Sequence, residues 1–213
     1  MIQNRRGAAA IALAVLMVTA GCGFLSGSTT SFSADKATVS DSAASESGYE
    51  EVKIEAQNVS REFSAAGQSR EVNVTNWLAQ YDRQVDLGPL GERRAGVFAA
   101  FSTPAVEILG QTFNPIDDMS DRDIIERFQE NYQSVNVGQQ VDSADIETLN
   151  KSAEVNKYEG TAEIGGSEVD VYIHLSKFRH GDDFIVALAI YPQDLDGEEE
   201  RAMTMYRGLE HEK

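Results

Sequence analysis

Residues 155–191 contain the pattern that most constrains how this chain folds: three apolar-rich runs separated by two turn signals. The first signal is Gly165-Gly166, which suits a two-residue hairpin because glycine tolerates positive φ at both positions. The second signal lies at residues 179–182. The middle run alternates, and its apolar face consists of Val169, Val171, Ile173 and Leu175. The last run, 184–191, is apolar throughout, as expected of a strand covered on both faces. The pattern predicts a three-stranded antiparallel meander.

Further elements are predicted upstream and downstream of the meander. Strands are expected at residues 52–59, 71–82, 95–101 and 106–110. Ser120 is a good helix N-cap with aspartates in the first turn, so a helix should begin there. A second helix is expected over residues 198–210. Antiparallel strands with one or two packed helices predict an α+β fold.

The first 21 residues have the pattern of an export signal. Arg5 and Arg6 precede a run without charged residues at 8–20, and small residues then lead to Cys22. The apolar run is too short for a durable membrane span. Because the only cysteine directly follows the small residues, we expect a lipobox, with lipid on Cys22 after cleavage. The alternative is an ordinary signal with a chance cysteine. The arginine pair is compatible with twin-arginine export, and the Sec route stays open.

The segment 22–48 is rich in serine and threonine and has no regular apolar period. We therefore expect it to be a flexible tether, because such a segment buries too little apolar surface to offset its ordering entropy. Residues 49–213 are expected to form the folded domain. This order of segments predicts a domain held by lipid at the outer face of the cytoplasmic membrane.

The net charge of −17 results from 35 acidic and 18 basic side chains. Such a surface repels itself in dilute buffer, and molar salt screens the repulsion. Acidic residues spread along the chain, with few lysines, favour a halophilic protein over an acidic protein from an ordinary habitat. The charge also argues against binding of nucleic acid, which depends on clustered Lys and Arg. A single cysteine excludes an internal disulfide and a multi-cysteine metal site.

Several tracts resemble a family of haloarchaeal lipoproteins of unknown function. They are 74–78 (VTNWL), 98–104 (FAAFSTP), 110–116 (GQTFNPI), 172–175 (YIHL), 181–184 (GDDF) and 191–192 (YP). The resemblance extends over residues 50–212 and implies an export signal with a lipobox, a salt-adapted exterior and no known activity. A strand entering Ser-Thr-Pro, beside an antiparallel sheet with helices, is more distantly similar to the α/β/α sandwiches of PsbP/Mog1 type. That similarity concerns fold alone.

The candidate ligand surface consists of Trp77, Tyr81 and His174. Trp77 and Tyr81 share one strand face and could stack on a sugar or peptide, although aromatic residues at this spacing are more often core. His174 could serve acid–base chemistry. His180, in a turn with two aspartates, could help to hold a cation, but it also suits a plain turn. The aspartates of loop 117–123 could bind calcium, yet their spacing is not that of an EF-hand and two of them suit helix capping.

Three sequons mark expected glycosylation sites at Asn58, Asn73 and Asn150, with Asn150 the best placed. The sequence contains no nucleophile elbow, phosphate loop, zinc-protease motif or dinucleotide fingerprint. It therefore predicts no catalytic residue, cofactor or metal. The favoured hypothesis is a surface module that binds or scaffolds a protein, a glycan or a small solute. The alternatives are a hydrolase-like enzyme using carboxylates and His174, and a cation-binding envelope protein.

Overall fold

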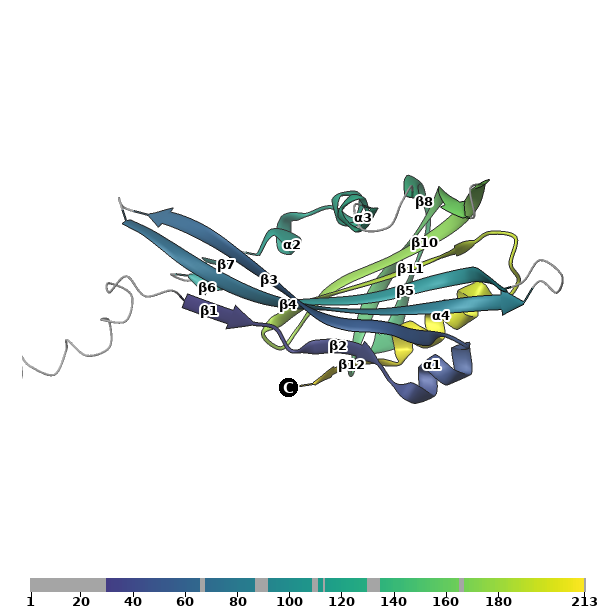
Figure 1. Cartoon of the computed structure of the whole chain (residues 1–213), viewed down its shortest axis with the longest axis horizontal. Coiled ribbons are helices and arrows are strands. Elements are labelled where there is room, and N and C mark those ends of the chain that lie inside the picture. The colour runs from purple at the N-terminus through teal and green to yellow at the C-terminus, as the bar shows by residue number, and fades with distance from the viewer. Residues whose placement is uncertain are drawn as a thin grey trace, which may run out of the picture. The chain divides into compact units, whose positions relative to one another are not determined.

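The structure is a computed structural model that describes residues 30–65, 68–86, 92–108, 111–112, 114–129, 135–164 and 167–212. The chain divides into two compact units. The smaller combines residues 1–31 and 60–73, and the larger combines residues 32–59 and 74–213. The described part of the smaller unit consists largely of hairpin segments. The folded core described next lies in the larger unit (Figure 1).

The described residues form an eight-stranded sheet in the order β1-β4-β5-β11-β10-β9-β8, with β3 paired to β4. Its strands are β1 (Thr30–Ser33), β3 (Glu50–Ala65), β4 (Gln68–Asp86), β5 (Glu92–Pro104), β8 (Val135–Thr148), β9 (Lys151–Ile164), β10 (Ser167–His180) and β11 (Asp183–Pro192). Two smaller two-stranded sheets pair β2 (Lys36–Val39) with β12 (Leu209–Glu212), and β6 (Glu107–Ile108) with β7 (Gln111–Thr112).

The predicted meander is confirmed. Strands β9, β10 and β11 are antiparallel neighbours, and the register places Ser167 opposite Ile164 and His180 opposite Asp183. Gly181 in the second turn has φ +62°, a value that glycine adopts without strain. Strand β11 lies between β10 and β5 and is buried along nearly its whole length, which explains its continuous apolar run.

Two hydrophobic clusters lie on opposite faces of the sheet, because successive side chains of β11 point to opposite sides. Ile185, Ala187, Ala189 and Tyr191 belong to the first cluster, whereas Val186 and Leu188 belong to the second. Helices α1 (Asp41–Ser47) and α4 (Glu198–Arg207), with β2 and β12, contribute to the first cluster. Helices α2 (Pro115–Asp118) and α3 (Asp121–Gln129) contribute to the second.

Tyr206 of α4 fixes the first cluster to the sheet. Its side chain is fully buried, and its hydroxyl donates to the backbone carbonyls of His174 at 2.9 Å and Ala187 at 3.1 Å. The alanines of β11 leave room for this large ring against the strand. Burial of the hydroxyl is therefore compensated by hydrogen bonds.

The predicted helix after Ser120 is confirmed as α3. The Ser120 hydroxyl accepts from the backbone N–H of Asp123, and the Asp123 carboxylate accepts from the backbone N–H and hydroxyl of Ser120. This reciprocal bonding is a capping box with aspartate at the third position. It lowers the pKa of the Asp123 carboxyl.

The predicted boundary between tether and domain was wrong. Strand β2 and helix α1 lie within segment 22–48, and Ala37, Val39 and Ala43 are buried in the first cluster. Their small side chains gave no strong local signal, because their burial depends on pairing with β12 at the far end of the chain. The second predicted helix, over 198–210, was too long: α4 ends at Arg207, and Leu209 begins β12.

Candidate functional site

The structure brings four polar side chains together at one end of the first cluster: Asp35, His180, Asp183 and His211. Each lies two residues along the chain from a hydrophobic residue that packs in the first cluster. Asp35 precedes Ala37, His180 follows Phe178, Asp183 precedes Ile185, and His211 follows Leu209. Alternation along the strands places His180, Asp183 and His211 on the same side as these cluster residues, and Asp35 joins them from the connection before β2.

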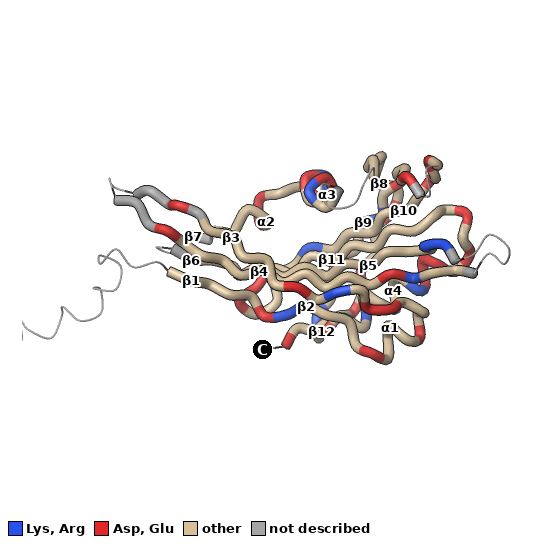
Figure 2. Tube along the Cα trace, in the orientation of Figure 1, with Lys and Arg blue, Asp and Glu red and all other residues tan. Residues whose placement is uncertain are grey.

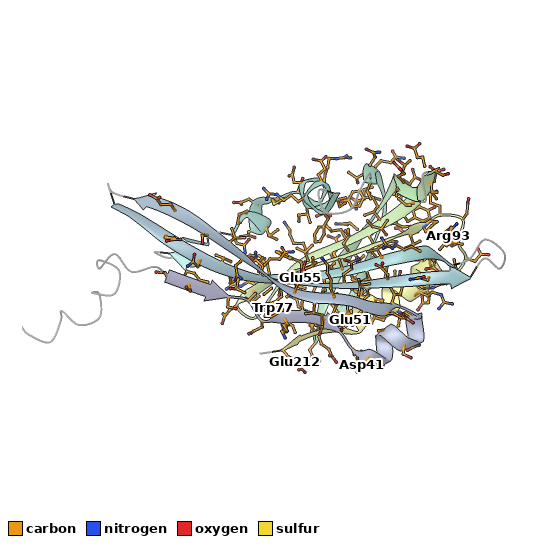
Figure 3. All side chains as sticks on the ribbon, in the orientation of Figure 1. Asp41, Glu51, Glu55, Trp77, Arg93 and Glu212 are labelled. Carbon is orange, nitrogen blue, oxygen red and sulfur yellow. The ribbon has the colours of Figure 1, made fainter. Side chains whose placement is uncertain are left out.

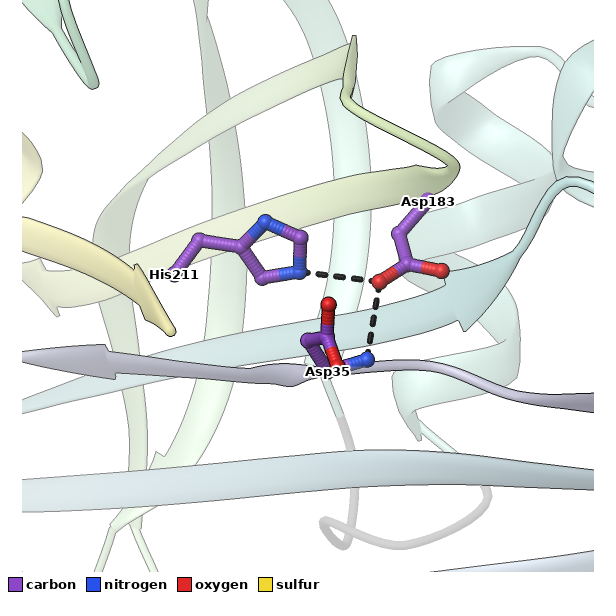
Figure 4. Close-up of side chains that lie close together, drawn as sticks. All are labelled: Asp35, Asp183 and His211. Carbon is purple, nitrogen blue, oxygen red and sulfur yellow. Dashed lines mark hydrogen bonds and ion pairs between the residues drawn. The ribbon is translucent and has the colours of Figure 1, made fainter. Parts of the chain in front are cut away.

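His211 and Asp183 form the buried centre of this group (Figure 4). The Nε2 of His211 lies 2.9 Å from Oδ2 of Asp183, and their side chains are 5% and 4% exposed. The same Oδ2 accepts the backbone N–H of Asp35 at 2.8 Å. The Ser102 hydroxyl donates to the backbone carbonyl of Asp35. The backbone at Asp35 is thus fixed on both sides.

The second ring nitrogen of His211 is also occupied. Its Nδ1 lies 2.8 Å from Nδ1 of His180, and the two rings meet edge to face at 70°. Burial, and then the neighbouring His211, lower the pKa of His180, which favours its neutral form. A neutral His180 can donate or accept at this bond, according to its tautomer.

The Asp35 carboxylate faces the pair from the β1–β2 connection (Figure 4). Ligand atoms of Asp35, Asp183 and His211 all lie within 4.8 Å of one another. Two carboxylates and one imidazole therefore converge at a position where Asp183 is buried and Asp35 and His211 are half-buried. Among the described residues, this is the one group of three or more His, Cys, Asp or Glu side chains that meets such a spacing.

The predicted ligand surface of Trp77, Tyr81 and His174 is not assembled at the exterior. Tyr81 and His174 are 2% exposed, and the Tyr81 hydroxyl accepts from the backbone N–H of Val39 at 3.0 Å. Trp77 is half-buried, with the ammonium of Lys36 4.5 Å from its ring centroid (Figure 3). Tyr81 packs in the first cluster with residues of β2 and α1.

His174 is a core residue. Its Nε2 lies 2.8 Å from the Tyr191 hydroxyl, and burial lowers the pKa of His174 to about 4. The imidazole is therefore neutral at ordinary pH. A hydrolase centred on His174 therefore gains no support from this arrangement.

The acidic loop at 117–123 does not gather its carboxylates. Asp121 accepts from Asn156 and Tyr158, each at 2.9 Å, while Asp123 caps α3. Asp117 and Asp118 are exposed in the first turn of α2. The calcium interpretation therefore gains no support from the arrangement of these side chains.

A separate hollow of about 360 Å³ opens beside α1. Its lining includes Asp41, Glu50 and Glu51 with the rings of Tyr49 and Tyr81, and Figure 3 labels two of these acids. The hollow contains no histidine, and it carries less recognisable chemistry than the Asp35–Asp183–His211 group.

The remaining predicted sites differ in how far the structure describes them. Arg5, Arg6 and Cys22 lie outside the described residues. Asn150 is exposed in the β8–β9 turn with φ +60°. Asn58 accepts from the Thr75 hydroxyl at 2.8 Å, and Asn73 accepts from the Ser60 hydroxyl. The two hydrogen bonds thus link the asparagine of each β3–β4 sequon to the hydroxyl of the other.

Sequence reasoning missed Asp35 and His211. Asp35 fell within the expected tether, and His211 followed a segment expected to be helical. A signal existed in each case. The sequence alternates over a short run, and the polar residue lies at one end of this run, two positions from a buried apolar residue.

No curated protein matches this chain. The family model described as Domain of unknown function (DUF6517) matches residues 36–210, which is most of the chain. Asp35 and His211 lie immediately outside the two ends of this match. The chain belongs to the DUF6517 family of domains of unknown function.

Proposed function

We propose that this protein is an exported lipoprotein whose folded domain acts as a binding or scaffolding module at the outer face of the cytoplasmic membrane. The observation that carries the proposal is the order of Arg5-Arg6, the uncharged run 8–20 and Cys22. Within the described residues, no helix is both long and apolar enough to span a bilayer. The proposed anchor is lipid on Cys22, and durable attachment needs two lipid chains.

The short distance between Cys22 and the first described strand supports a scaffolding role. Strand β1 begins at Thr30, so residues 23–29 are the only link from the anchor. Eight Cα–Cα steps join Cys22 to Thr30, and at about 3.6 Å per step they extend at most about 29 Å. A module tied so closely would meet partners embedded in, or lying against, the same membrane.

The chemistry of the site supports binding over hydrolysis. His174 bonds to Tyr191 in the core, and the ring nitrogens of His211 contact Asp183 and His180. In the described part of the chain, neither imidazole is hydrogen-bonded to a serine, threonine or cysteine that it could activate as a nucleophile. A second candidate function, cation binding at the envelope, is favoured by the convergence of Asp35, Asp183 and His211.

Salt adaptation and fold type form part of the proposal. Asp and Glu are distributed over most of the described elements instead of gathering in one patch (Figure 2), which supports a halophilic, haloarchaeal lipoprotein. The placement of helices on both faces of the sheet supports an α/β/α sandwich of PsbP/Mog1 type. An experimental structure with a different order of layers would contradict that assignment.

Fractionation of cells expressing Cys22→Ser tests the anchor. The variant should leave the membrane fraction and accumulate in the medium, because no lipid can be attached. Ser26→Ala is the matched control in the same segment and should stay with the membrane. Retention of Cys22→Ser on the membrane, with the same processing as the control, would contradict the proposal.

A further inference from the structure

We propose that Asp35, Asp183 and His211 bind one divalent transition-metal ion, for which Zn²⁺ is the probe of choice. The three ligand atoms come from the β1–β2 connection, the start of β11 and strand β12, and they lie within 4.8 Å of one another. The site uses residues distant in sequence and depends on the fold alone. It does not depend on lipid at Cys22.

The distances are close to those of a metal site. In a tetrahedral zinc site with bonds of about 2.1 Å, ligand atoms lie about 3.4 Å apart. The His211 Nε2 to Asp183 Oδ2 distance of 2.9 Å would widen by about 0.5 Å, and the longest separation, at most 4.8 Å, would contract by at most about 1.4 Å. Rotation of the partly exposed Asp35 side chain can supply most of the contraction, because no described residue donates a hydrogen bond to its carboxylate.

The surroundings of His211 suit a metal ligand. A ligating histidine usually passes its second ring N–H to a hydrogen-bond acceptor, which fixes the tautomer and the ring orientation. Here Nε2 faces the carboxylates, and Nδ1 lies 2.8 Å from Nδ1 of His180. When the metal replaces the Nε2 proton, the Nδ1–H can donate to His180. His180 is thus a positioning residue.

The charge at the site favours a cation. Asp183 is nearly fully buried, and Asp35 brings a second carboxylate to within 4.8 Å of both Asp183 and His211. Two carboxylates so close repel each other, and a positive charge between them relieves the repulsion. A divalent ion supplies that charge. The mixture of two oxygens and one imidazole nitrogen suits Zn²⁺ or Mn²⁺ better than Ca²⁺, which prefers oxygen ligands.

Calorimetric titration of the purified, chelator-treated full chain with Zn²⁺ in molar KCl tests the site. We expect one saturable ion per chain. Asp35→Asn and His211→Gln should each weaken binding at least 100-fold. Their matched controls, Asp117→Asn at an exposed acid and His174→Gln at a buried histidine, should bind as the parent does. Asp35→Asn keeps the backbone bonds to Asp183 and Ser102, so circular dichroism should show an unchanged fold.

The orienting role of His180 has its own variant. His180→Phe retains a ring of similar size without a nitrogen, and it should weaken Zn²⁺ binding by 10- to 100-fold while stoichiometry stays at one. Unchanged affinity would overturn that role. Absence of saturable Zn²⁺ binding, or equal binding by Asp35→Asn and Asp117→Asn, would overturn the site and leave His211 and Asp183 as a structural pair. Ca²⁺ binding as tight as Zn²⁺ binding would overturn the assigned metal class.

Discussion

Replacement of His174 should change how the stability of the domain depends on pH. Burial lowers the pKa of His174 from 6.5 to about 4 in the folded protein. Between these values the unfolded chain binds a proton that the folded chain does not. The free energy of unfolding therefore falls as pH drops from 6.5 to 4. Above pH 6.5 the contribution of His174 to this free energy is constant. At about 1.4 kcal/mol per pKa unit, the loss amounts to about 3 kcal/mol.

Denaturant unfolding of the parent and His174→Gln in molar KCl, at several values between pH 7.5 and 4, measures this loss. Glutamine can still bond to the Tyr191 hydroxyl, but it does not titrate. All other ionisable groups are common to the two proteins, so the difference between the two curves isolates His174. The parent should lose about 3 kcal/mol more than the variant on acidification. Parallel curves would refute a buried, neutral His174.

Three further predictions concern packing and charge. The fully buried Glu198 carboxylate lies 2.6 Å from the Arg83 guanidinium. Glu198→Gln should lower the free energy of unfolding by about 3 kcal/mol, because the guanidinium loses its charged partner. Glu200→Gln, at an exposed ion pair, should lower the free energy of unfolding by less than about 0.5 kcal/mol. Equal destabilisation of the two variants in thermal unfolding would refute the difference between the buried and the exposed pair. Gly208→Ala would place a Cβ 2.2 Å from that of Ala43 and should cost about 1–3 kcal/mol. Ala43→Gly in the same chain should recover part of the loss, and no recovery would contradict this contact. The melting temperature should rise from millimolar to molar KCl, and indifference to salt would contradict the halophilic proposal.

The predictable part of the fold is the part encoded locally. Alternation in β10 and the unbroken apolar run of β11 reveal the strands, and the glycine turns reveal their order. The α3 helix carries its start signal in Ser120 and Asp123. In each case the residues that determine the element lie within the element or beside it.

The elements that sequence reasoning missed depend on distant partners. Strand β2 is short and built from small residues, and its pairing partner β12 lies near the other end of the chain. Strand β8 is mostly exposed at a sheet edge, so its apolar pattern is weak. Helix α1 buries Ala43 and Ser47, which resemble linker residues when seen alone. Their packing could not be inferred from local periodicity.

The candidate site shows the same limit. His180 and Asp183 were visible as a turn with polar residues, and the structure pairs them across the β10–β11 hairpin. Asp35 and His211 join them only because β2 and β12 form their own small sheet over the same face. Tyr81 shows the same limit from the other side. Its place in a strand was predicted, but its burial by residues of β2 and α1 was not.

Mass spectrometry of the N-terminal peptide of the mature protein distinguishes a lipidated Cys22 from an unmodified one. We expect a chain that begins at Cys22, with lipid on its sulfur. A full-length chain that begins at Met1 and carries an unmodified thiol at Cys22, recovered away from the membrane, would contradict it.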